Sequence, residues 1–244
     1  MEPKIIIHGG FFSESSANQD MKEAKQKALS EIVSKAHEYL QDHSAVEAAV
    51  YAVTLLEDCE LFNAGIGSQL QADGKIRMSA SVMDGASQCF SGVVNIQDIK
   101  NPILVAEKLL NYQDHVLSGS EALDFARKQG FSYFNPETPS RREEYEKRLK
   151  QSEGKGTVGC VALDKAGRLA AATSTGGKGF EMPGRVSDSA TVAGNFATNI
   201  AAISCTGIGE DIVNNALAAK IITRVTDGMS LEDANKKSFA ELKV

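Results

Sequence analysis

The order of the predicted elements constrains the fold of this 244-residue chain most strongly. A short apolar run over 4–8 predicts a strand, apolar residues at helical spacing over 21–40 predict a helix, and the pair Ser44 and Glu47 is a capping box that opens a second helix. Hairpins follow, and helix pairs flank them at both ends. Because regular β-α-β alternation is absent, the pattern favours an α+β layered sandwich over a doubly wound sheet.

The middle and the end of the chain supply the remaining elements. After the turn Asp73-Gly74, apolar and polar residues alternate from Ile76 to Val82. This alternation predicts a hairpin strand with one buried face. Further strands are expected over 90–96, 157–163, 169–173, 190–198 and 201–205. Further helices are expected with Asn101, Ser118 and Ser230 as caps, and one more helix after Gly209.

Residues 131–156 lose this periodicity and gather charges, so about 135–156 is interpreted as a charged linker without a helix. Its basic residues alternate with glutamates, as in Arg142-Glu143-Glu144 and Glu146-Lys147. The chain carries 26 Lys and Arg against 32 Asp and Glu, and the net charge of −6 repels phosphate backbones. No nucleic-acid partner is expected.

Several other classes of protein are also excluded. No apolar run approaches the roughly 20 residues that a membrane span needs, and the start Met1-Glu2-Pro3-Lys4 lacks a signal peptide's apolar stretch, so we expect a cytoplasmic protein. The four cysteines form no CxxC pair, which argues against zinc or a disulfide framework. Gly176-Gly177-Lys178 lacks the spacing of a phosphate loop, and a GxSxG elbow is absent.

Thr157 stands where the charged linker meets a strand. An internal threonine is an ordinary strand residue. If the Gly156–Thr157 bond were cut, however, Thr157 would gain a free α-amine with an ordinary pKa of about 8. Such an amine can accept the proton of its own hydroxyl, so that one residue supplies both the nucleophile and the base.

Six segments together carry a resemblance that covers nearly the whole chain: LEDCELFNAGIG, SVMDG, GTVGCVALD, AATSTGG, MPGRVSDS and SCTGIGE. In this order they resemble the plant-type L-asparaginases, also called isoaspartyl peptidases, of the N-terminal nucleophile hydrolases. The resemblance implies a four-layer αββα sandwich in one domain over 1–244. It also implies a precursor that cleaves itself into an α-subunit, 1–156, and a β-subunit, 157–244.

By the same resemblance, the cleaved α/β pairs form a homodimer that hydrolyses β-aspartyl dipeptides and L-asparagine to L-aspartate, with no catalytic cofactor. Thr157 is then the nucleophile, and Thr175 supports it. Arg185 and Asp188 match the pair that holds the substrate's α-carboxylate and α-ammonium. The other matching residues are Thr206 and Gly207 as the oxyanion hole, Gly209 as a backbone contact to the ligand, and Asn63 near the nucleophile.

The loop before Asn63 resembles the family's sodium site. Main-chain carbonyl oxygens suit a hard cation such as a structural sodium ion. The carbonyls that match are those of Leu56, Glu57, Cys59, Phe62, Ala64 and Ile66.

Three features depart from the family pattern: Phe11-Phe12 after His8-Gly9-Gly10, Ser187 in place of a glycine, and the lack of the core strands that follow the last helix. Two alternatives stay open. One is a silent homologue that serves as a binding or assembly module. The other is the specificity of a glycosylasparaginase or a threonine endopeptidase, although Gly156 before the nucleophile favours the plant-type branch.

Overall fold

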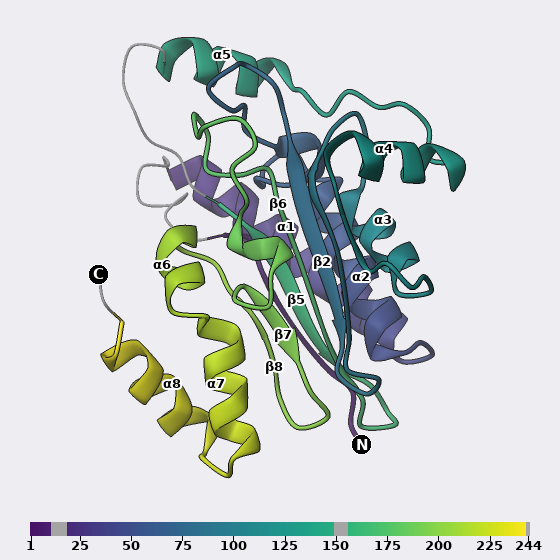
Figure 1. Cartoon of the computed structure of the whole chain (residues 1–244), viewed down its shortest axis with the longest axis vertical. Helices are drawn as coiled ribbons and strands as arrows, with labels where there is room; N and C mark the ends of the chain where they lie inside the picture. The colour runs from purple at the N-terminus through teal and green to yellow at the C-terminus, as the bar shows by residue number, and fades with distance from the viewer. Residues whose placement is uncertain (11–18, 149–155, 243–244) are drawn as a thin grey trace.

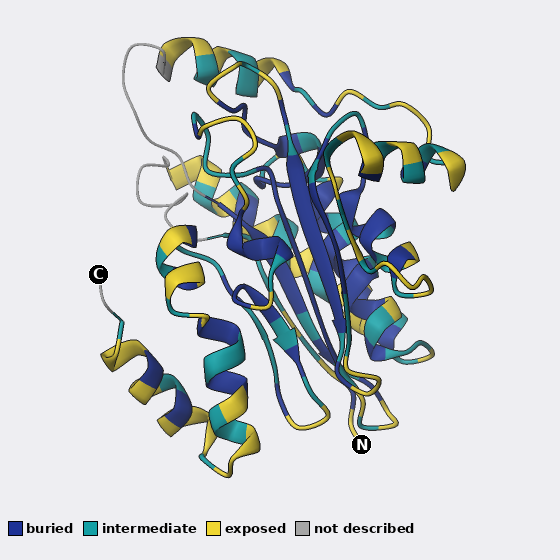
Figure 2. Ribbon diagram, viewed as in Figure 1, coloured by how far each residue is buried: buried dark blue, intermediate teal, exposed yellow. Residues whose placement is uncertain are grey.

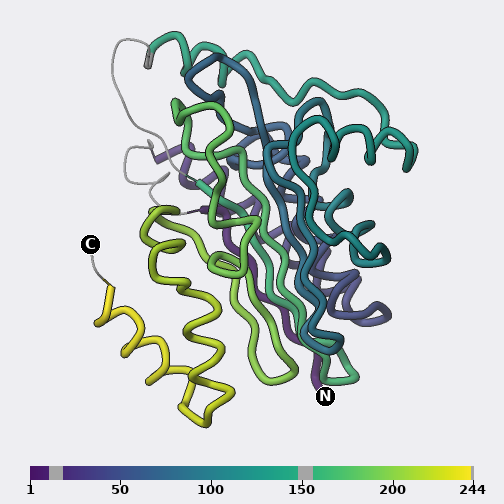
Figure 3. The backbone as a smooth tube through the Cα atoms, viewed as in Figure 1, coloured from purple at the N-terminus to yellow at the C-terminus, as the bar shows by residue number. Residues whose placement is uncertain are grey.

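The structure is a computed structural model that describes residues 1–10, 19–148 and 156–242. These residues form a six-stranded sheet, in which neighbouring strands are antiparallel except for the last pair. Figure 3 shows how this order brings distant segments side by side. In spatial order the strands are β1 (Lys4–His8), β5 (Val158–Leu163), β6 (Leu169–Thr175), β2 (Met78–Asp84), β3 (Cys89–Ile96) and β4 (Val116–Ser118).

Helices cover one face of this sheet (Figure 1). They are α1 (Gln19–Leu40), α2 (Ala45–Glu57), α3 (Pro102–Leu109) and α4 (Gly119–Lys128). α2 packs on β5 and β6, and α3 packs on β2 and β3. In Figure 2 the central strands β5, β6, β2 and β3 are largely buried, whereas the edge strands β1 and β4 and the outer surfaces of the helices are more exposed. The predicted capping box is confirmed, since Ser44 and Glu47 bond each other's backbone at the start of α2.

A two-stranded sheet of β7 (Asn195–Ala197) and β8 (Ala202–Ser204) packs against β6 on the opposite face. α7 (Leu217–Thr226) packs outside β7 and β8, and α8 (Leu231–Ala240) packs on α7. α6 (Gly209–Asn214) leads into this helical layer (Figure 1). The observed fold class is α+β, as predicted.

The prediction of one buried face for β2 is wrong. Every residue of β2 from Met78 to Met83 is buried, because the helices cover one face and the segment around β7 covers the other. Alternation along β6 follows the same division, since Ala172 belongs to the helical core and Ala171 packs with Ala197 of β7.

Three local predictions also need correction. Asn101 and Ser118 precede α3 and α4, but neither side chain makes the capping hydrogen bond. The helix expected after Gly209 is divided, because Ala216 adopts a left-handed φ of 46° between α6 and α7.

The charged segment expected to lack a helix contains α5 (Pro139–Arg148). The ring of Tyr145 in α5 stacks on Phe180 with centroids 4.8 Å apart, and Arg141 donates to the Gly67 carbonyl at 2.7 Å. These contacts anchor a helix that apolar periodicity did not predict. The rest of that segment up to 155, and Phe11-Phe12, lie outside the described residues. In the part of the chain that the structure describes, no helix has the length and apolar character needed to cross a membrane.

Candidate active site

Thr157 directly precedes β5 and is 8% exposed. Its Oγ1 donates to Thr175 Oγ1 at 3.3 Å, and the Thr175 hydroxyl donates in turn to the Gly156 carbonyl at 3.1 Å. The backbone N–H of Gly177 also donates to Thr175 Oγ1 at 3.1 Å. The end of β6 therefore holds the Thr175 hydroxyl between the proposed nucleophile and the carbonyl on its N-terminal side.

Asn63 supplies a second donor to the same carbonyl. Its buried Nδ2 lies 2.7 Å from the Gly156 oxygen and 2.5 Å from the Gly177 oxygen, and its Oδ1 accepts the Gln69 N–H at 3.0 Å. These contacts fix the orientation of the amide. Two side-chain donors, one from a loop and one from the end of β6, thus converge on Gly156 O, where negative charge would develop if Thr157 attacked that carbonyl. The sequence placed Asn63 near the nucleophile but did not indicate this contact.

Arg185 and Asp188 line the same narrow cleft as Thr157, together with Gly207 and Gly209. A Cβ at Gly209 would lie 2.5 Å from Arg185 Nη2 and 2.7 Å from Asp188 Oδ1. Only glycine allows the backbone to pass this close to both charged groups. The three residues expected to bind substrate are therefore brought together.

The two charged side chains are held by different neighbours. Arg185 Nε donates to Glu210 Oε1 at 2.8 Å, and Ser187 Oγ donates to Asp188 Oδ1 at 3.2 Å. Asp188 Oδ2 is buried and has no hydrogen-bond partner among the described residues. Burial raises the pKa of Asp188 to about 6, against the opposing effects of Ser187 and the Arg185 charge. The two oxygens of Asp188 therefore face different neighbours, since Oδ1 lies beside Gly209 of the cleft and Oδ2 lies against Gly194.

The predicted oxyanion residues lie at the end of β8. Gly207 has a φ of 153° and lines the cleft. Thr206 Oγ1 is buried, and within the described ranges it has no hydrogen-bond partner. Among the described residues, Gly207 lines the cleft with Thr157 but Thr206 does not.

The predicted cation loop is built from closely packed main-chain oxygens. A Cβ at Gly65 would lie 2.3 Å from the Glu57 carbonyl, and one at Gly67 would lie 1.9 Å from the Phe62 carbonyl. Two of the six matching carbonyls, those of Glu57 and Phe62, thus lie directly against glycine backbone in this loop, and main-chain oxygen is the ligand type that a hard cation takes. No group of three His, Cys, Asp or Glu side chains that could hold a metal occurs among the described residues.

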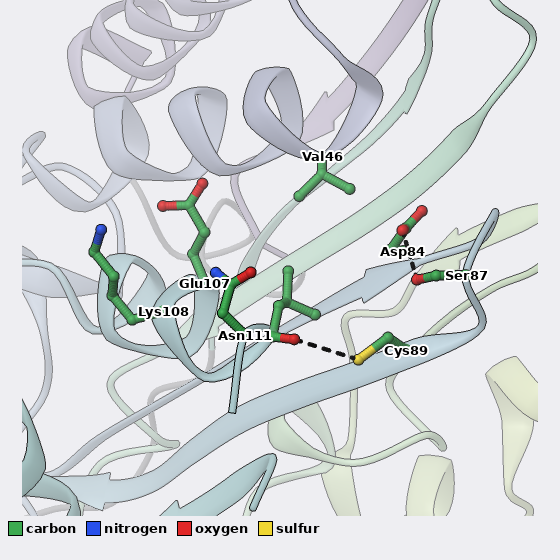
Figure 4. Close-up of a pocket in the computed structure, with 8 residues that line it drawn as sticks. Val46, Asp84, Ser87, Cys89, Glu107, Lys108 and Asn111 are labelled. Carbon is green, nitrogen blue, oxygen red and sulfur yellow. Dashed lines mark hydrogen bonds between the residues drawn. The ribbon is translucent and has the colours of Figure 1, made fainter. Parts of the chain in front are cut away.

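A roomier pocket lies elsewhere, between α2, the end of α3 and the β2–β3 turn (Figure 4). Its volume is about 460 Å³, against about 20 Å³ for the cleft at Thr157. Cys89 Sγ lies there 3.7 Å from His115 Nδ1, and burial raises the pKa of the thiol, which disfavours the reactive thiolate. None of the predicted site residues lines this pocket. The cleft at Thr157 is therefore chosen as the candidate site for the residues that line it and not for its volume.

Comparison with known proteins concerns the whole chain and identifies its family. The family model described as Asparaginase matches residues 1–244. The isoaspartyl peptidase/L-asparaginase of Nostoc sp. is 48% identical over 99% of this chain and 82% of its own length. The isoaspartyl peptidase of Salmonella typhimurium is 38% identical over 97% of this chain and 83% of its own length. The plant-type L-asparaginase of Pyrococcus horikoshii is 37% identical over 97% of this chain and 84% of its own length.

The chain belongs to the asparaginase family. This membership confirms the family resemblance inferred from the six sequence segments.

Sequence reasoning missed two groups beside the site. Glu210 bridges Arg185 and Lys178, with 2.9 Å between Lys178 Nζ and Glu210 Oε1. Burial acts to raise the pKa of Glu210, but the bonds from Arg185 and Lys178 outweigh it and hold that pKa at about 2. The position of Glu210 directly after Gly209 in this family motif was the available signal.

The second group is a chain of hydrogen bonds beneath the nucleophile. His8 Nδ1 lies 3.2 Å from the Thr157 carbonyl, which can only accept, so Nδ1 carries the proton. His8 Nε2 then accepts from Ser204 Oγ at 2.9 Å, and Ser204 accepts from Thr173 Oγ1 at 2.7 Å. Burial lowers the pKa of His8 to about 4, so the imidazole is neutral near pH 7. The members come from β1, β6 and β8, and sequence spacing gives no sign of such a long-range set.

Proposed function

We propose that this chain cleaves its own Gly156–Thr157 bond and then hydrolyses β-aspartyl dipeptides and L-asparagine, releasing L-aspartate. The observation that carries the proposal is the convergence at Gly156. The Thr157 hydroxyl bonds Thr175, while Thr175 and Asn63 both donate to the carbonyl that Thr157 would attack. The printed names of the relatives, isoaspartyl peptidase and L-asparaginase, support the substrate class.

In the first stage, Thr157 Oγ bonds to the Gly156 carbonyl carbon and the bond from that carbon to the Thr157 nitrogen breaks. The hydroxyl proton passes to the nitrogen, which becomes a free amine. The product is an ester between Gly156 and the Thr157 side chain. The charge that develops on the Gly156 oxygen is stabilised by Asn63 Nδ2 and the Thr175 hydroxyl. Water then hydrolyses the ester, which leaves a carboxylate on Gly156 and a free α-amine on Thr157.

In the second stage, the free amine of Thr157 accepts the proton of its own hydroxyl as that oxygen attacks the substrate's β-carbonyl. The amide nitrogen leaves as an amine, and water then hydrolyses the acyl ester to L-aspartate. Arg185 would grip the α-carboxylate and Asp188 the α-ammonium. Thr206 and Gly207 would stabilise the oxyanion, and Gly209 lets the ligand approach the backbone.

Three further features belong to the proposal. The packing of helices, β6, the β7–β8 sheet and α7 supports a four-layer αββα sandwich. The main-chain oxygens near Gly65 and Gly67 support a structural sodium ion, held by the carbonyls named above. A homodimer of cleaved pairs rests on the family resemblance alone.

The test follows the intact mass of purified protein during incubation. We expect two fragments that stay associated, the smaller beginning Thr-Val-Gly-Cys. Thr157→Ala should stay whole because it lacks the attacking hydroxyl, and Thr157→Ser, which keeps the hydroxyl, should still cleave. Cleavage of Thr157→Ala at this bond would contradict the mechanism.

Substrate assays complete the test. Matured enzyme should hydrolyse β-Asp-Leu well, but not its N-acetyl form or α-Asp-Leu. Losing the ammonium leaves Asp188 without its partner, at a cost of about 1.5–3 kcal/mol, or roughly tenfold to a hundredfold in rate. Comparable rates on all three peptides would favour an endopeptidase, and a chain that never cleaves would favour the silent homologue.

A further inference from the structure

The cleft contains a cation that the proposed mechanism leaves without a role. Lys178 follows Gly177, whose N–H donates to Thr175 Oγ1 and whose carbonyl accepts from Asn63 Nδ2. The backbone of Lys178 is therefore fixed one residue from the groups that hold the proposed nucleophile. Its side chain lines the same cleft as Thr157 and is 40% exposed.

The charged groups of the cleft form an ordered row. Asp188 Oδ1 and Arg185 Nη2 flank Gly209, Arg185 Nε bonds Glu210, and Glu210 bonds Lys178 on the same oxygen. With a pKa of about 2, Glu210 stays ionised at neutral pH and keeps both cations in place. Lys178 thus stands at the opposite end of the row from Asp188.

The charges of the candidate substrates can be matched to this row. L-Asparagine carries one ammonium and one carboxylate, which Asp188 and Arg185 would bind. A β-aspartyl dipeptide carries a second carboxylate, at the C-terminus of the leaving residue. Among the described residues that line the cleft, Lys178 is the cation that remains.

We propose that Lys178 binds the C-terminal carboxylate of the leaving residue and so favours β-aspartyl dipeptides over L-asparagine. The inference rests on the proposed function of this site. An exposed lysine–carboxylate pair contributes little net stability. The Lys178 ammonium can therefore bind the substrate carboxylate, either beside Glu210 or in place of it. Its three donors and flexible stem suit that exchange.

The test compares two enzymes on three substrates. Wild type and Lys178→Gln are compared on β-Asp-Leu and on β-Asp-Leu amide, which differs only in lacking the terminal charge, with L-asparagine as a third substrate. We expect kcat/KM of Lys178→Gln to fall about three- to tenfold on β-Asp-Leu and less than twofold on the other two. Lys100→Gln removes a similarly exposed, paired lysine away from the cleft and should change none of these values.

Each outcome decides between readings. An equal fall on all three substrates would mean that Lys178 only positions Glu210 and Arg185, and no fall on β-Asp-Leu would mean that it does not touch the leaving residue. Either result overturns the inference while leaving the proposed function intact. Failure of matured wild type to hydrolyse any of the three would overturn both.

Discussion

Glu57 on the helical face of the six-stranded sheet and His8 on the opposite face should respond to pH in opposite directions. On the helical face, the fully buried Glu57 ends α2, and its Oε1 accepts from Ser174 Oγ at 2.6 Å and from the Ile103 N–H at 3.1 Å. On the other face, His8 ends β1 and bonds Ser204 of β8. Both groups stay largely uncharged near pH 7.

The same physical cause acts on both residues. Burial raises the pKa of Glu57 to about 8 despite its hydrogen-bond donors, and burial lowers the pKa of His8 to about 4 despite the Thr157 carbonyl. The two side chains differ in how their polar atoms are satisfied. His8 belongs to a continued chain of hydroxyls, whereas Glu57 Oε2 has no hydrogen-bond partner in the described part of the chain. His8 is therefore held at both ring nitrogens, whereas Glu57 is held at one carboxylate oxygen.

Glu57→Gln should give the largest effect on this comparison. Between the ordinary carboxyl pKa of 4.5 and the folded value near 8, the folded state holds a proton that the unfolded state lacks. This stabilisation is fully present below pH 4.5 and is lost as pH rises through 8, by up to about 1.4 kcal/mol per pH unit. Urea unfolding from pH 5 to 8, in the Thr157→Ala background to keep the chain whole, should show that slope.

The glutamine variant keeps the hydrogen bonds to Ser174 and Ile103 but cannot titrate, so its slope over this window should be flatter than that of the parent. Glu121→Gln removes an exposed glutamate of α4 and should leave the slope unchanged. Equal slopes for the parent and Glu57→Gln would mean that Glu57 ionises as readily in the folded state as in the unfolded one.

His8→Asn should act in the opposite direction and over a narrower window. Between a folded pKa near 4 and the ordinary value of 6.5, the unfolded state binds a proton that the folded state rejects. The contribution of neutral His8 is therefore present above pH 6.5 and is lost as pH falls toward 4, again by up to about 1.4 kcal/mol per unit. Asparagine can still donate to the Thr157 carbonyl but does not titrate, so unfolding between pH 4 and 7 should lose this slope.

His37→Asn is the matched control, because His37 is exposed on α1. If this control flattens the acid limb as much as His8→Asn does, the pH dependence does not come from the chain of hydrogen bonds under the nucleophile.

The sequence predicted the helices that are stabilised by residues close together in the chain. The apolar spacing of α1 and the caps Ser44 and Ser230 fix their helices within a few residues, and the structure confirms them. α5 escaped prediction because contacts distant in sequence, such as the stack of Tyr145 on Phe180, hold it in place. The second buried face of β2 escaped for the same reason, since the segment that covers it begins about a hundred residues later.

The candidate site divides in the same way. Motifs identified the residues that line the cleft, including Thr157, Arg185 and Asp188, because each sits in a segment typical of the family. Sequence could not reveal that Asn63 and Thr175 share one carbonyl acceptor. Such convergence depends on the order in which strands pair and on the path of the loop that carries Asn63, and no spacing along the chain encodes either.

The smallest prediction compares one substitution on the two faces. Val82 of β2 is fully buried in the helical core, and Val161 of β5 is half-buried toward β7 and β8. Val82→Thr places a hydroxyl among apolar side chains and should cost about 1–3 kcal/mol of unfolding free energy. Val161→Thr keeps the same shape at a half-buried position that water can reach, so its cost should stay below about 0.5 kcal/mol. Urea denaturation of both variants at pH 7 measures the difference directly. Equal losses would mean that the helical face tolerates a hydroxyl as well as the opposite face does, and the contrast between the two faces would then reduce to Glu57 and His8 alone.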